Sequence, residues 1–131
     1  MLYIASEQPV PRVLWREAEP AFHVSDLAED EQRVLAQFSK RFVAYLGAHT
    51  GCSCGFCREE EGDSQAERSL EDLRSYLRSV TMQLGSVEMF QCWDGDQLAA
   101  PGERHTLTPD DLTPELVCYV DPPWFATVNP D

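Results

Sequence analysis

The pattern of apolar and polar positions predicts one main helix, at residues 69–84. Its apolar residues recur at the spacing of a single helical face: Leu73, Tyr76, Leu77, Val80 and Leu84. Ser69 followed by Asp72 resembles a capping box, and Ser64 followed by Glu67 offers an alternative start one turn earlier. The glycine after position 84 is placed to end the helix. We therefore expect an amphipathic helix with its apolar face against a sheet.

Runs of β-forming residues predict the strands of that sheet: 2–6, 41–49, 86–93, 103–108, 115–120 and 124–128. The run 41–49 is almost continuously apolar, which is typical of a central strand buried on both faces. Shorter helical segments are predicted at 25–38 and 108–111. Because the links between strands are mostly short, the pattern indicates an α+β fold with a mostly antiparallel sheet, covered on one face by the main helix.

The length of the chain fits a single domain. With 131 residues, of which 43% are hydrophobic, residues 1–131 have enough apolar surface for a core without disulfide bonds. Within this domain we expect residues 1–22 to form an extended arm, since Pro9, Pro11 and Pro20 block a long helix. Residues 58–68 are rich in glutamate and predict an acidic loop.

The charge of the chain restricts its partners. Ten basic and 23 acidic residues give a net charge of −13. Nucleic acids and anionic membranes repel such a chain, so we expect neither as a ligand. The sequence shows no secretory signal and no apolar run long enough to span a bilayer, which favours a cytoplasmic protein with reduced thiols. A basic protein is the partner that the charge would suit.

The segment His49–Cys57, with the sequence HTGCSCGFC, concentrates the candidate chemistry. Zinc prefers thiolate and imidazole ligands. Cys52, Cys54 and Cys57 would supply three of the four that it needs, with Cys92 or His49 as the preferred fourth ligand. Cys118 and His105 are further candidates for that position. The spacing lacks the second, distant cysteine pair that makes a zinc site specific.

Redox chemistry and a purely structural role are the alternatives for the same cysteines. Cys54 to Cys57 spell CGFC, which looks like the active-site pattern of thioredoxin-type oxidoreductases, but no apolar helix pattern follows it, so we do not assign that fold. The hypothesis of a reactive dithiol on another fold is left open. Cysteine is also a small residue that is readily buried, and the neighbouring glycines mark a tight turn, so the cluster has a structural interpretation as well.

Histidine and aspartate near the cluster add two weaker hypotheses. His49 follows the predicted central strand and could act as the base for Cys52 or Cys54 in a thiol-dependent enzyme, although no nucleophile motif supports this. Asp94 and Asp96 lie in the segment CWDGD. Asp-Gly is typical of a hairpin turn, and the calcium-binding pattern is incomplete.

The stretch FSKRFVAYLGAHTGCSCGF together with CWDGD resembles a family of small bacterial proteins of unknown function that share a GCxCGF loop and a CWDGD-like turn. The resemblance spans residues 38–96 and implies no activity. Cys52 and Cys54 match the family pattern, whereas Cys57 departs from it.

Three functions therefore stand as expectations. The first is a non-catalytic binding or interaction domain whose cysteine loop is structural or binds zinc. The second is a thiol-dependent enzyme or redox protein that uses Cys52, Cys54 and Cys57 with His49. The third is an acidic inhibitor of the immunity type, which neutralises a basic partner.

Overall fold

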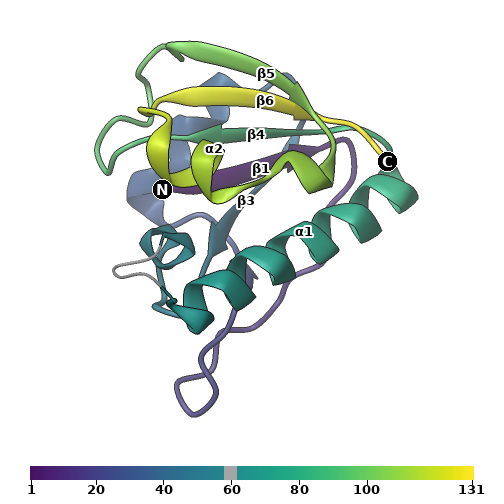
Figure 1. Ribbon diagram of the computed structural model, residues 1–131. Helices are drawn as coiled ribbons and strands as arrows, with labels where there is room; N and C mark the ends of the chain where they lie inside the picture. Colours follow the sequence, from purple (N-terminus) through teal and green to yellow (C-terminus); the bar gives the residue numbers. More distant parts are fainter. Residues whose placement is uncertain (58–61) are drawn as a thin grey trace.

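The computed structural model describes residues 1–57 and 62–131. In these residues a sheet of six strands has the order β2-β3-β1-β4-β6-β5 (Figure 1). Its strands are β1 (Leu2–Ser6), β2 (His23–Ser25), β3 (Phe42–Gly47), β4 (Val87–Gln91), β5 (Glu103–Leu107) and β6 (Trp124–Val128). All neighbouring pairs are antiparallel except β5 and β6, which are parallel. The predicted α+β fold with a mostly antiparallel sheet is thus confirmed.

The main helix, α1 (Ser64–Leu84), lies across one face of the sheet (Figure 1). Asp63 caps it by accepting hydrogen bonds from the backbone N–H groups of Gln65 and Ala66, each at 3.1 Å. The helix therefore begins at the earlier of the two predicted starts. It ends at Gly85, whose φ of +81° favours glycine.

Alternation along the strands divides the core into two layers. Leu2 and Ile4 of β1 face α1 and pack with its buried residues, which include Leu73 and Leu77. Tyr3 faces the opposite side, where η1 (Glu29–Gln37), a 3₁₀ helix, contributes Val34. The sheet is therefore covered on both faces, and this explains why β1, β3 and β4 are rich in buried apolar residues.

Several predicted boundaries change in the structure. Leu2–Ser6 is an interior strand of the sheet, so the extended segment is confined to residues that follow it. Residues 64–68 of the predicted acidic loop already belong to α1, and residues 58–61 lie outside the described part of the chain. The segment CWDGD forms a turn at Gly95, but the next strand, β5, pairs with β6 instead of returning along β4.

The strand predicted at 115–120 is wrong. Pro114–Tyr119 forms a short helix, α2. The apolar and β-forming residues of ELVCYV favoured a strand, but Leu116 and Val117 are buried from one side of a helical turn. Thr113 is the N-cap of this helix and Pro114 is its first residue, a start signal that the strand interpretation overlooked. The structure also adds η2 (Ser53–Phe56) and the single turn η3 (Pro109–Asp111), of which only the latter was expected.

Candidate functional site

The cysteine loop leaves the end of β3 and turns back immediately. The Ala48 N–H donates to the Cys52 carbonyl and the Gly51 N–H donates to the Ala48 carbonyl, each at 3.0 Å. Gly51 has a φ of +86°, so this turn requires a residue that tolerates the left-handed region. The chain then enters η2, and the apolar ring of Phe56 is buried in the core. The loop is therefore anchored at both of its ends.

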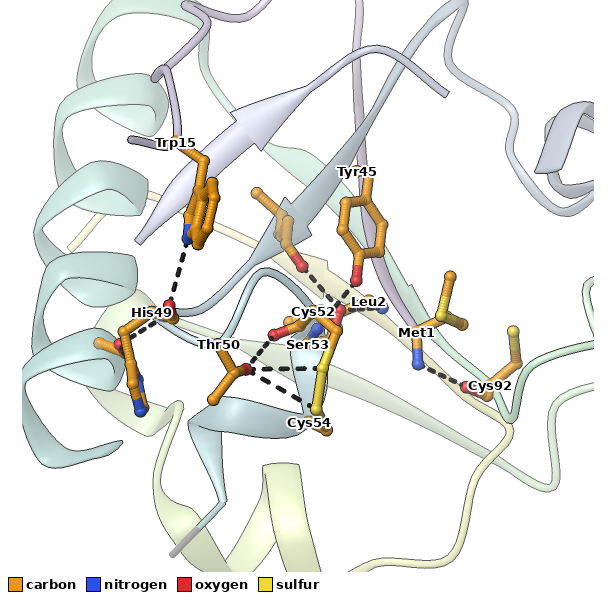
Figure 2. The surroundings of a disulfide bond; sticks show 12 residues. Met1, Leu2, Trp15, Tyr45, His49, Thr50, Cys52, Ser53, Cys54 and Cys92 are labelled. Carbon is orange, nitrogen blue, oxygen red and sulfur yellow. Dashed lines mark hydrogen bonds between the residues drawn. A yellow bond between two sulfur atoms is a disulfide. The ribbon is translucent and has the colours of Figure 1, made fainter. Parts of the chain in front are cut away.

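Ser53 fixes the loop against the sheet. Its hydroxyl donates to the Leu46 carbonyl at 2.7 Å and accepts from the Leu2 N–H at 2.9 Å. Its own N–H donates to the Tyr45 hydroxyl at 2.8 Å (Figure 2). Ser53 is 4% exposed, so these bonds form away from water and tie the loop to both β1 and β3. The cysteines on either side of Ser53 are held in place as a result.

Four of the five cysteines form two disulfide bonds. Cys52 pairs with Cys54, two residues away, and Cys57 pairs with Cys118 in α2, 61 residues away. Cys92 is free and buried. We expected reduced thiols, but the turns that curl the loop bring Cys54 next to Cys52, and α2 packs against η2 so that Cys118 meets Cys57.

All five cysteines line one cavity of about 520 Å³. The cavity lies between the cysteine loop, the turn that follows β4, and α2 with the segment after it. Trp93 and Asp94 from the CWDGD segment contribute to its wall, and so does Asp121. The cysteine loop and the CWDGD turn therefore meet at one cavity.

The exposure of the sulfur-bearing residues differs across this cavity. Cys54 is exposed, Cys52 and Cys57 are partly exposed, and Cys92 is 1% exposed. Burial raises the pKa of the Cys92 thiol to about 11, and the carboxylates of Asp96 and Asp94 act in the same direction. Cys92 is thus a protonated thiol at neutral pH, whereas the Cys52–Cys54 pair is open to an incoming reagent.

Thr50 lies beside the exposed disulfide. Its hydroxyl is 3.5 Å from the Cys52 sulfur and 3.7 Å from the Cys54 sulfur, and it donates to the Cys52 carbonyl at 3.2 Å (Figure 2). A hydroxyl in this position is able to donate to a thiolate that forms when the disulfide opens. The sequence did not point to Thr50, because no motif marks it and its proximity to the two sulfurs depends on how the loop folds.

His49 does not join the cysteines. Its Nδ1 lies 2.9 Å from the Ser69 hydroxyl on α1, and its ring is directed away from the disulfide (Figure 2). It lines a separate cavity together with Ser69 and other residues of α1. The predicted pairing of His49 as a base with Cys52 or Cys54 is therefore absent from the geometry of the described residues.

The three cysteines predicted as the main zinc ligands are divided between the two disulfides, with Cys52 and Cys54 in one and Cys57 in the other. A sulfur in a disulfide is not the thiolate that zinc requires. In the described part of the chain, no three His, Cys, Asp or Glu side chains are arranged to hold a metal ion. His105 lies on β5, away from the cysteine cavity, and packs against the ring of Trp124. Zinc binding by the reduced chain stays a prediction.

Comparison with known proteins adds no relative. No protein-family model, no curated protein and no solved structure matches the chain. Of the helices that the structure describes, none combines the length and the apolar character needed to cross a membrane.

Proposed function

We propose that this protein is a thiol–disulfide redox protein whose exchanging group is the Cys52–Cys54 pair. The observation that supports this most directly is the convergence of all five cysteines on one cavity, with Cys54 exposed at that cavity. Reactive cysteines are found in partly exposed sites, whereas buried structural cysteines are inert. The loop that carries the pair is also anchored by buried hydrogen bonds of Ser53, none of which involves a cysteine side chain.

The two disulfides have different consequences for stability. A disulfide stabilises a fold mainly by restricting the unfolded chain, and this effect grows with the length of the loop that it closes. The Cys57–Cys118 bond closes a loop of 61 residues, whereas the Cys52–Cys54 bond spans only two. The fold therefore gains much from the first bond and little from the second. This difference favours a structural role for the first and a reactive role for the second.

The proposed reaction is disulfide exchange with an external thiol. A thiolate attacks the exposed Cys54 sulfur, a mixed disulfide forms, and the bond to Cys52 breaks with its electron pair on the Cys52 sulfur. The Cys52 thiolate then takes a proton from water. Until it is protonated, the Thr50 hydroxyl is placed to donate a hydrogen bond to it. A second external thiol then displaces Cys54. In total, two thiols become one disulfide, and the Cys52–Cys54 pair gains two electrons and two protons.

The test is a redox titration of each cysteine pair. The oxidised protein is equilibrated in buffers with different ratios of dithiothreitol to its oxidised form, quenched with acid, alkylated and analysed by peptide mass spectrometry. We expect Cys52 and Cys54 to become alkylated, and to pair again on oxidation, while Cys57 and Cys118 stay bonded. The proposal fails if Cys52 and Cys54 do not pair under oxidising conditions, or if they open only when the whole fold unfolds.

A second measurement separates this function from zinc binding. The fully reduced protein is incubated with an equivalent of Zn²⁺ and passed through a desalting column before metal analysis. Redox chemistry predicts that the protein elutes without the metal. Retention of one equivalent that is lost in Cys52→Ala would support the zinc site instead.

A further inference from the structure

The charge around the cysteine cavity points to the kind of thiol that reaches it. Among the described residues that line the cavity, the charged side chains are Asp94 and Asp121, both exposed and both negative. The positive group at this cavity is the N-terminal ammonium of Met1, which donates to the Cys92 carbonyl at 2.8 Å and whose pKa is lowered by burial, so it faces an incoming reagent less than the two carboxylates do. The chain as a whole carries a net charge of −13. An approaching anion is therefore repelled both at a distance and at the opening, whereas a cation is attracted.

An aromatic surface lies next to these carboxylates. Trp93 lines the same cavity and is 65% exposed, an unusual state for so large an apolar side chain. An indole face beside a carboxylate suits the side chains of lysine and arginine, which bind aromatic rings through cation–π contacts and pair with carboxylates at the same time. The indole and the carboxylates together favour an incoming thiol that has a positively charged side chain close to its sulfur.

We propose that the redox partner of this protein is a cysteine within a basic peptide segment of another protein. This inference rests on the proposed function, because it names the substrate of the Cys52–Cys54 pair. The cavity volume of about 520 Å³ is in the range that accommodates side chains of a bound peptide. Free glutathione carries a net negative charge at neutral pH, so the same charges disfavour it.

The exchange takes the form already given, with the peptide cysteine as the external thiol. Its thiolate attacks Cys54, Cys52 leaves, and a second peptide thiol completes the reduction. Asp94, Asp121 and Trp93 do not take part in bond making. They hold the basic side chains that flank the peptide cysteine, and so raise the rate at which its sulfur meets Cys54.

The experiment measures the opening of Cys52–Cys54 by two peptides and by glutathione. One peptide carries a cysteine flanked by two lysines on each side, and the other carries glutamates in the same positions. Each rate is divided by the rate of the same thiol with 2-hydroxyethyl disulfide, a neutral reference that removes the effect of the flanking charges on thiol reactivity. At low salt we expect a corrected rate at least about 10-fold higher for the lysine peptide than for either other thiol. This preference should shrink in 0.5 M salt.

Three variants assign the preference to the cavity. Asp94→Asn combined with Asp121→Asn should bring the corrected ratio of the two peptides close to one, and Trp93→Ala should lower the rate with the lysine peptide several-fold. Glu7→Gln combined with Glu17→Gln makes the same change in net charge at exposed positions that do not line the cavity, and it should keep the ratio.

The outcomes separate the two proposals. If neither peptide nor dithiothreitol opens Cys52–Cys54 in the folded protein, the proposed function is wrong, and this inference fails with it. If both peptides open the pair at equal corrected rates, or if the aspartate variant keeps the preference, only the inference on a basic partner is overturned. Faster reaction with glutathione would identify a small anionic thiol as the substrate and would also overturn it.

Discussion

Single atoms decide whether the cysteine loop can close. A Cβ atom at Gly55 would collide with the Thr50 hydroxyl and would lie 2.9 Å from the Cβ of Ala48. Both of those contacts involve short, stiff side chains, so the loop has no simple way to make room. Gly55 is thus required by space and not by an unusual φ value. The same close approach places the Thr50 hydroxyl against the Cys52–Cys54 sulfurs.

The buried thiol of Cys92 leads to a prediction at the same scale. Its pKa is raised to about 11 in the folded protein, mainly by burial, whereas a cysteine in an unfolded chain has a pKa of about 8.5. Between these values the folded protein keeps a proton that the unfolded chain has lost, so the free energy of unfolding should fall as the pH rises. We expect urea titrations of the oxidised protein at pH 8 and pH 10 to show this fall. In Cys92→Ala the fall should be smaller, and an equal fall in both proteins would exclude Cys92 as its source.

At the level of elements, α2 is held to the rest of the fold by more than its disulfide. The Val117 carbonyl accepts a hydrogen bond from the Gln91 side chain at 3.0 Å, which joins α2 to the end of β4. Leu116 and Val117 belong to the same apolar layer as α1. The Cys57–Cys118 bond therefore connects two elements that already pack together, and its main effect is on the unfolded chain.

The two cysteine pairs should differ in their effect on stability. From loop closure, we expect Cys57→Ala combined with Cys118→Ala to lower the free energy of unfolding by about 4 kcal/mol. Cys52→Ala combined with Cys54→Ala also removes two sulfur atoms and one disulfide bond, and it should lower the free energy of unfolding by less than about 2 kcal/mol. Urea titrations without reductant measure both values, and each variant is the control for the other. Equal losses would show that loop length does not distinguish the pairs.

The whole molecule is dominated by its negative charge. The net charge of −13 is distributed over a small domain, and its ion pairs, such as Arg12–Asp26 and Arg74–Glu71, lie at the surface. Exposed ion pairs contribute little to the free energy of unfolding, so screening them with salt destabilises the fold only slightly. Repulsion among the excess carboxylates, by contrast, is relieved by screening.

Moderate salt should therefore stabilise this protein. We expect the midpoint of urea unfolding at pH 7 to rise between about 20 mM and about 200 mM sodium chloride, a range over which the screening length falls severalfold. Urea is suitable because it is uncharged and does not itself change the ionic strength. A midpoint that stays constant or falls would mean that local ion pairs outweigh the general repulsion.

The sequence predicted the sheet and α1 well because both depend on local periodicity. Leu73 and Leu77 recur at helical spacing and are buried as expected, and the strand predicted at 41–49 is present as β3, at Phe42–Gly47. The error at 115–120 arose because a short apolar run fits a strand and a helical turn equally well, and packing decided between them. Leu35, an apolar residue of the helical segment predicted at 25–38, is 44% exposed, since a 3₁₀ helix turns its side chains differently from an α-helix.

The candidate site was predicted only in part. Cys92 was named as a candidate fourth ligand beside the cysteine loop, and the CWDGD turn that begins with it does line the same cavity as that loop. The pairing of Cys57 with Cys118 joins residues that are 61 positions apart, and no local pattern encodes such a contact. Thr50 and Asp121 belong to the same group, because their roles depend on the tertiary fold that surrounds the sulfurs.

The long loop closed by Cys57 and Cys118 has a consequence for biosynthesis. Cys52, Cys54 and Cys57 leave the ribosome almost together, whereas Cys118 follows 61 residues after Cys57. At a translation rate of about 5–20 residues per second, Cys57 waits for several seconds without its final partner. During that interval the nascent chain offers it first Cys52 and Cys54 and then Cys92, none of which is its native partner, so the native connectivity has to be reached either by late oxidation or by reshuffling after release.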